Sequence, residues 1–193
     1  MAGHFEATPG GGAAVALDEV EIAILRSLAV QLLELIGPGD EPAEGEDPLA
    51  ALFAEGPSEP PTDPALARLF PEAYGDKGDE LRAASAEFRR FTENDLRTRK
   101  REDALVVVRT LDALTPAGDG AAVLTLTADE CRNWLGSLND LRLTIGTRLE
   151  VGEEEDEGSS LYRLPDSDPR KPMVMAYLWL GALQETLVET LMP

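Results

Sequence analysis

The 193-residue chain contains one cysteine, Cys131, and one histidine, His4. A single thiol excludes an intrachain disulfide and suits a reducing compartment, so we expect a cytoplasmic protein. His4 lies in a Gly-rich N-terminal segment, residues 1–16, which offers no partner residues for nucleophilic catalysis with a histidine. The sequence has no pair of cysteines or cluster of histidines spaced to hold a transition metal. We therefore expect no metal site and no catalytic residues of these types.

Other signatures of chemistry are also missing. The sequence has no Gly-rich phosphate loop, because the glycines at 10–12 do not precede a helix with Lys and Ser or Thr. The acidic run GEEEDEG, residues 152–158, lacks the alternation and the central glycine of a calcium loop. We expect a non-enzymatic protein without a cofactor.

Long apolar runs are absent as well. The longest, MVMAYLWLGAL at 173–183, has about half of the ~20 residues that a bilayer requires, and it predicts a core helix. The N-terminus, MAGHFEATPGGG, lacks the basic region and the apolar stretch of a signal peptide. We expect no membrane association.

Basic residues are scarce: 17 Lys and Arg stand against 37 Asp and Glu, and the net charge is −20. Such a charge opposes non-specific attraction to DNA and to anionic membranes. The acids gather in two stretches, which we interpret as acidic loops over residues 37–63 and 151–160. A direct contact with DNA is therefore disfavoured, although the sequence does not exclude it.

Hydrophobic periodicity and capping residues predict helices over 18–36, 63–74, 79–114, 127–151 and 168–191. Residues 121–126 predict one short strand, residues 1–17 suggest a small hairpin, and residues 47–54 suggest a short amphipathic turn. The expected fold is mainly α: a five- to six-helix, bundle-like single domain over residues 1–193, with at most short peripheral strands.

The scarce basic residues are concentrated: seven of the 17 lie between Arg82 and Arg101. At about 100° per residue, Leu81, Ala84, Phe88 and Phe91 share one helix face, which we interpret as the core face. Arg90, Arg97 and Arg101 then form a basic stripe on the opposite, outer face. The predicted partner-binding residues are Arg89, Arg90, Arg97, Lys100 and Arg101.

Two interpretations of the basic stripe remain open. It pairs with the chain's own acids, including Glu87 and Glu93, or it docks a partner, with a protein favoured over nucleic acid. The residues Asp95, Arg99 and Glu102 follow in line with the predicted core face. Either the helix projects beyond the core there, or these residues form a buried acid–base–acid network.

Cys131 occupies the first turn of its predicted helix, on the apolar face. It is either a buried core thiol or a redox-sensitive thiol that could pair only between two chains. The second interpretation would give a homodimer, and the sequence does not decide the oligomeric state.

Three segments carry a resemblance to a known family: FRRFTENDLRTRK (88–100), WLGSLNDLRLTIGTRL (134–149) and AYLWLGALQETLVETL (176–191). The sequence resembles an actinobacterial family catalogued as a domain of unknown function, over roughly residues 17–192 apart from the acidic loops. Genes of that family often neighbour those of the ClpS protease adaptor and of cysteine biosynthesis. One branch is described as an oxidation-sensing transcription regulator that works with a stress sigma factor.

The resemblance implies a stress-related regulator of transcription that acts through a protein partner such as a sigma factor. The alternative is an adaptor or scaffold in ClpS-type protein turnover. The redox branch uses two cysteines that form an intramolecular disulfide, whereas this chain has only Cys131. No sensor residue is therefore carried over from the family.

Overall fold

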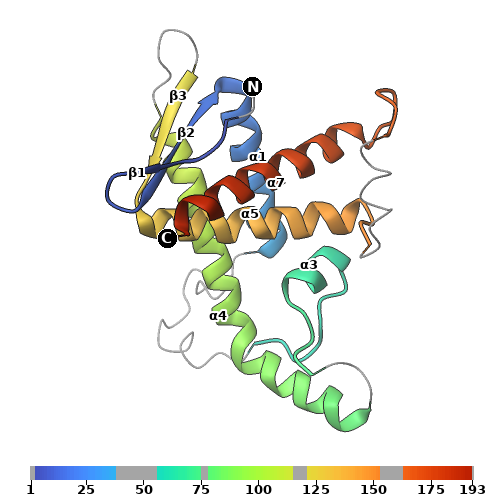
Figure 1. Ribbon diagram of the computed structural model, residues 1–193. Coiled ribbons are helices and arrows are strands. Elements are labelled where there is room, and N and C mark those ends of the chain that lie inside the picture. The colour runs from blue at the N-terminus through green and yellow to red at the C-terminus, as the bar shows by residue number, and fades with distance from the viewer. Residues whose placement is uncertain (1–2, 38–55, 75–77, 115–120, 153–162, 193) are drawn as a thin grey trace, which may run out of the picture.

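The computed structural model describes residues 3–37, 56–74, 78–114, 121–152 and 163–192 (Figure 1). Within these ranges it contains five helices and three short strands. They are β1 (Glu6–Thr8), β2 (Gly12–Asp18), α1 (Glu19–Ile36), α3 (Pro64–Leu69), α4 (Asp79–Asp112), β3 (Ala121–Leu126), α5 (Ala128–Arg148) and α7 (Lys171–Leu191). The predicted mainly α fold with short strands is confirmed. The predicted turn at residues 47–54 lies outside the described residues.

The strands form one antiparallel sheet in the order β1-β2-β3. The N-terminal hairpin turns at Gly10 and Gly11, whose positive φ angles of 110° and 85° favour glycine. The pairing of β2 with β3 runs from Ala13 opposite Leu126 to Asp18 opposite Ala121. The sequence predicted both the hairpin and the third strand, but not that a segment more than 100 positions away would pair with β2.

Three of the five helices in the described ranges begin where a side-chain cap satisfies their first N–H groups, whereas α4 and α7 have no such cap. Asp18 and Thr127 cap α1 and α5 and form capping boxes with Glu21 and Glu130, respectively. Asp63 caps α3, with Pro64 in the first turn, as the sequence predicted. The helix ends at Leu69, earlier than the predicted Tyr74, and α5 ends before the predicted residue 151.

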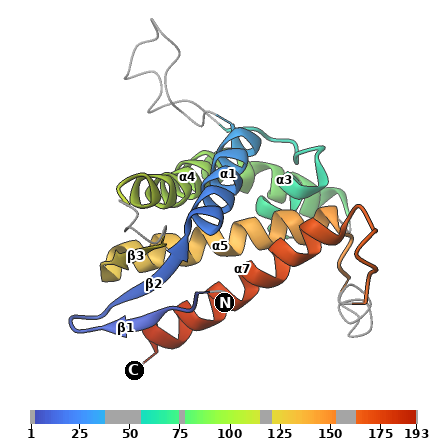
Figure 2. The same cartoon turned by 90° about the horizontal axis from the view of Figure 1, so that it is seen from above.

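Helix α5 lies in the middle of the molecule, with α7 on one side and α1 and α4 on the other (Figure 2). The apolar periodicity of residues 127–151 predicts a core face of Cys131, Leu135, Leu138, Ile145 and Leu149, with Trp134 and Leu141 beside it. All of these side chains are buried except Leu135, which is partly buried. The N-terminus is attached to this core. The Phe5 ring meets the Trp134 ring edge-on at 6.0 Å, and the Phe5 N–H donates to Thr186 Oγ1 over 3.1 Å. A ring contact with α5 and a hydrogen bond to α7 therefore hold Phe5 against the core.

The hydrophobic periodicity of α1 predicts a core face of Val20, Ile24, Leu28, Leu32 and Leu35, widened by Leu25, Leu33 and Ile36, and this prediction is only partly right. Leu25, Ala29, Leu32 and Ile36 are the buried residues of this helix, whereas Val20 and Ile24 are exposed. Helices α4 and α5 and strand β2 contact α1, and the side chains of Val20 and Ile24 stay in solvent. Several apolar rows on one helix look equivalent in sequence, and the position of the neighbours selects one of them.

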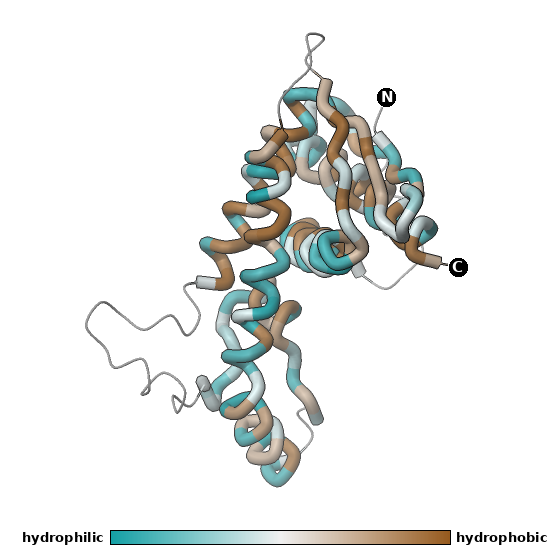
Figure 3. Tube along the Cα trace, turned by 90° about the vertical axis from the view of Figure 1, so that its left-hand side faces the viewer, coloured by the Kyte–Doolittle hydropathy of each residue, from teal (hydrophilic) through white to brown (hydrophobic). Residues whose placement is uncertain are grey.

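Helix α4 runs uninterrupted through 34 residues, about 50 Å at ~1.5 Å per residue. Its C-terminal part packs against α1 and α5, while its N-terminal part extends beyond them. Figure 3 shows this projection, in which hydrophilic and hydrophobic residues alternate along the chain. In the part of the chain that the structure describes, no helix has the length and apolar character needed to span a bilayer.

Candidate functional site

The N-terminal half of α4 contains a buried ion-pair network centred on Glu93. The side chains of Arg89 and Glu93 are 5% and 3% exposed, and Arg89 Nη1 donates to Glu93 Oε2 over 2.5 Å. Arg97 Nε and Nη2 donate to the other carboxylate oxygen over 2.9 and 2.7 Å. Each pair has the i, i+4 spacing that brings side chains together on a helix. Glu93 is thus held between two guanidinium groups.

The same arginine network reaches the segment after α3. Arg89 Nη1 and Nη2 donate to the Phe70 carbonyl oxygen over 3.1 and 3.2 Å, and Nη2 also donates to Glu72 Oε1 over 3.1 Å. The Arg97 guanidinium lies 4.4 Å from the centre of the Phe70 ring. Arg89 and Arg97 therefore fix residues 70–72 against α4.

Two arginine side chains of α4 bind the C-terminal end of α1. Arg97 Nη1 donates to the Ile36 carbonyl over 2.6 Å, and Arg101 Nη1 donates to the carbonyls of Leu33 and Gly37. The last carbonyls of a helix lack intrahelical donors and carry partial negative charge, so guanidinium groups satisfy them well. Arg97 and Arg101 therefore act as a C-terminal cap supplied by a different helix.

A second polar layer joins α4 to α5. Lys100 Nζ donates to Asp140 Oδ1 over 2.6 Å, and Asn133 Nδ2 donates to Asp103 Oδ1 over 2.8 Å. Burial raises the pKa of both Asp140 and Asp103, and in each case a hydrogen bond opposes this shift, from Lys100 and Asn133, respectively. Lys100 is thus occupied by an internal acid.

The predicted orientation of α4 is wrong in its N-terminal half. Phe88 and Phe91, assigned to the core, are 47% and 59% exposed, whereas Arg89 is buried. Arg97 and Arg101, assigned to the outer stripe, are partly buried with internal partners. Arg90 is also partly buried, and its guanidinium lies 5.0 Å from the Phe91 ring centre. The internal-pairing interpretation holds for Glu93, and a partner role for the five basic residues stays a prediction.

Asp95, Arg99 and Glu102 do not form a buried acid–base–acid network, because all three side chains are exposed. The helix projects beyond the core at this point, which was the other interpretation. Their exposure means that the helix face opposite to the Glu93 network is solvated.

The first half of α4 and the segment before it also expose apolar side chains. Tyr74, Leu81, Phe88, Phe91 and Leu96 are all exposed large hydrophobic residues, and we call them the exposed apolar face. The rings of Tyr74 and Phe88 meet edge-on at 5.9 Å. Aromatic residues on a surface supply large contact areas and are frequent anchors of protein–protein interfaces. The sequence showed the spacing of Leu81, Phe88 and Phe91, but this spacing indicates an apolar face without telling what covers it.

A small hollow of about 200 Å³ lies beside this face, between α4 and residues 70–73. Its apolar wall includes Phe70, Pro71, Phe88 and Leu96, and its polar side includes the Arg89–Glu93 pair. The volume is below the range of about 300–1,000 Å³ that small-molecule sites occupy. The hollow has the size for an inserted side chain, not for a metabolite.

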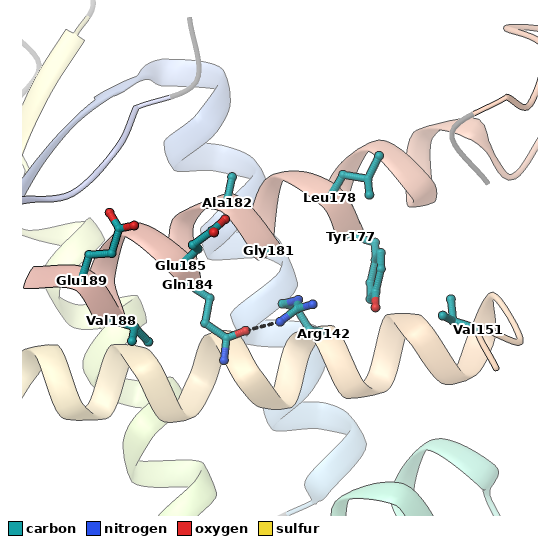
Figure 4. Close-up of a pocket in the computed structure, with 10 residues that line it drawn as sticks. All are labelled: Arg142, Val151, Tyr177, Leu178, Gly181, Ala182, Gln184, Glu185, Val188 and Glu189. Carbon is teal, nitrogen blue, oxygen red and sulfur yellow. Dashed lines mark hydrogen bonds between the residues drawn. The ribbon is translucent and has the colours of Figure 1, made fainter. Parts of the chain in front are cut away.

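A larger groove, about 700 Å³, lies between α5 and α7 (Figure 4). Arg142 reaches into it from α5, where its Nη1 donates to Gln184 Oε1 over 2.5 Å and its guanidinium lies 5.4 Å from the Tyr177 ring centre. Glu185 and Glu189 line the same groove and are exposed. Internal partners engage Arg142, and these neighbouring carboxylates disfavour an anionic ligand.

Cys131 is fully buried among core side chains, in agreement with the first of its two interpretations. Burial raises the pKa of the thiol, and the carboxylate of Glu130 adds to this effect. A buried, protonated thiol is a poor nucleophile, so the geometry disfavours redox chemistry at this position. Among the described residues, no three acids, histidines or cysteines are grouped to hold a metal ion.

Comparison with known proteins places this chain in a family. The family model described as a domain of unknown function (DUF2017) matches residues 2–191. The chain belongs to this family. The match spans nearly the whole sequence and confirms the resemblance that the three sequence segments indicated.

The curated relatives are mycobacterial. The protein named "Oxidative stress regulator AosR" in Mycobacterium tuberculosis is 31% identical over 183 residues, which cover 89% of this chain and 78% of the relative. A relative from Mycobacterium leprae is 33% identical over 186 residues, covering 89% of this chain and 79% of its own length. No solved structure matches the chain.

Proposed function

We propose that this member of the DUF2017 family is a regulator in the oxidative stress response that acts by binding another protein and catalyses no reaction. The relatives named oxidative stress regulators support the stress-related role. The exposed apolar face of α4 supports the protein contact and is the observation that carries the proposal, because a projecting helix with two solvent-exposed phenylalanines is unfavourable without a partner.

The distribution of charge supports a protein partner over direct DNA binding. Arg89, Arg97 and Lys100 make internal ion pairs, so they offer few contacts to phosphates. The net charge of −20 repels DNA at long range. A sigma factor is the partner class that the family resemblance suggests, and regulation of transcription would follow from that contact.

The test uses the double variant Phe88→Ala/Phe91→Ala in the organism of origin, with transcript levels measured before and after peroxide treatment. Both side chains are exposed, so the variant should fold, and circular dichroism verifies this. We expect the peroxide-dependent transcript changes to be lost, as in a strain without the gene. The matched control is Met173→Ala/Met175→Ala, which removes two exposed apolar side chains from α7 and should leave the response intact.

A full response in the Phe88→Ala/Phe91→Ala strain would contradict the proposal. Unchanged transcripts combined with altered lifetimes of cellular proteins would favour the alternative, an adaptor or scaffold in ClpS-type proteolysis. Direct DNA binding would be recognised by salt-sensitive binding of the purified protein to duplex DNA.

A further inference from the structure

The exposed apolar face has the dimensions of a helix-binding surface. From Leu81 to Leu96 it extends over about 22 Å, given ~1.5 Å per residue. An amphipathic helix that packs along it would place apolar side chains at i, i+3, i+4 and i+7 against Leu81, Phe88 and Phe91. The hollow between Phe70, Phe88 and Leu96 would receive one of those side chains as an anchor. The shape therefore fits a helix better than an extended peptide, since no sheet edge lies here in the described residues.

The charges around this face define the partner's chemistry. Between residues 83 and 102, the charged residues with exposed side chains are Glu87, Asp95, Glu102 and Arg99. Among the described residues, none of these three carboxylates takes part in an ion pair, whereas Arg89 and Arg97 are paired in the interior. The solvated side of α4 is therefore acidic, although the segment as a whole is basic in sequence.

We infer that the exposed apolar face of α4 binds an amphipathic helix whose apolar side is bordered by lysine or arginine. This rests on the proposed function and adds the chemical class of the partner surface. Basic residues beside the apolar contacts would pair with Glu87 and Asp95, and the net charge of −20 would accelerate the encounter. A second copy of this chain is a poor occupant, because two such acidic surfaces would repel each other.

The experiment measures fluorescence anisotropy of labelled model peptides titrated with the full chain. The first peptide is a helix of about five turns with leucines along one face and lysines elsewhere. Its twin has glutamate in place of every lysine. We expect the lysine peptide to bind and the glutamate peptide not to bind. Phe91→Ala should weaken binding of the lysine peptide about tenfold, as is usual for an interface anchor.

A charge-reversal pair separates local recognition from attraction by net charge. Glu87→Lys/Asp95→Lys changes the exposed apolar face, and Glu185→Lys/Glu189→Lys makes the same change in net charge on α7. We expect the first double variant to lose affinity for the lysine peptide and to gain affinity for the glutamate peptide. The α7 variant should retain most of the affinity of the unmodified chain.

Equal losses in the two double variants would mean attraction by net charge only, and the inference would be overturned. Binding of the glutamate peptide by the unmodified chain would also overturn it. So would a dimer in light scattering that becomes a monomer in Phe91→Ala, because a second copy would then occupy the face. If neither peptide binds while Phe88→Ala/Phe91→Ala still abolishes the stress response, the proposed function stands and the basic helix is the wrong partner class.

Discussion

In residues 79–97 of α4 the buried positions carry Ser85, Arg89 and Glu93, whereas in residues 98–112 they carry Ala104, Val107 and Leu111. The first half exposes the rings of Phe88 and Phe91 beside charged residues, whereas no aromatic ring is exposed in the second half, where Arg109 and Asp112 lie outside. One continuous helix thus follows the hydrophobic pattern in one half and departs from it in the other.

The neighbours of each half explain this difference. The second half faces the apolar sides of α1 and α5, so burial of alkyl groups stabilises the contact. The first half faces the carbonyl oxygens of Phe70 and Ile36, which need donors once they are removed from water. The guanidinium groups of Arg89 and Arg97 supply these donors, and Glu93 and Glu72 balance their charges. The comparison shows that backbone acceptors can orient a helix against its own hydrophobic pattern.

The largest expected effect comes from breaking the polar half at Glu93. Glu93→Gln removes the charge between two guanidinium groups and leaves a buried, uncompensated positive charge. We expect a loss of about 3–5 kcal/mol in the free energy of unfolding, measured by urea denaturation. Glu102→Gln, an exposed acid on the same helix, should change it by no more than about 0.5 kcal/mol. A loss below about 1 kcal/mol for Glu93→Gln would mean that the network does not orient the helix.

A smaller, pH-dependent effect is expected at Asp103, in the second half of α4. Burial raises the folded-state pKa of this carboxyl above its ordinary value of 3.8, so the folded chain binds a proton more readily than the unfolded chain. Stability from this group is therefore present below pH 3.8 and is lost as the pH rises through the folded pKa. Asp103→Asn removes this loss.

Urea denaturation of the unmodified chain and of Asp103→Asn over a series of pH values tests the direction of this pH dependence. The variant should gain stability relative to the unmodified chain as the pH rises from below 3.8 towards neutrality. Below pH 3.8 the difference between the two proteins should be constant. A difference that moves in favour of the unmodified chain with rising pH would show that the hydrogen bond from Asn133 outweighs burial.

The smallest effect on stability is expected at Phe91, in spite of its size. The side chain is 59% exposed, so Phe91→Ser should change the free energy of unfolding by about 0.5 kcal/mol or less. Leu111→Ala in the other half should lower it by about 2–5 kcal/mol, because Leu111 is buried in the core. Thermal denaturation of both variants measures the contrast, and a large loss for Phe91→Ser would place the ring in a contact that buries it.

The elements themselves were predictable because their signals are local. Asp18, Asp63 and Thr127 cap helices through contacts with residues two or three positions later, and Gly10 and Gly11 permit the hairpin turn. The core face of α5 was predictable because its apolar row is broad and buried by neighbours on both sides. The candidate site was predictable only as a segment: residues 82–101 were identified, but with the wrong side facing outward.

By itself, the sequence determined the helices and their capped ends, the strand at 121–126, the mainly α fold and the family, since these depend on local interactions and on residue identity. The tertiary structure decided the pairing of β2 with β3, the burial of Arg89 and Glu93, and the exposure of Phe88 and Phe91. Those features depend on the carbonyl and carboxylate oxygens that distant segments bring to α4. A buried acceptor stabilises whichever donor reaches it, and only the folded arrangement specifies which side of the helix that is.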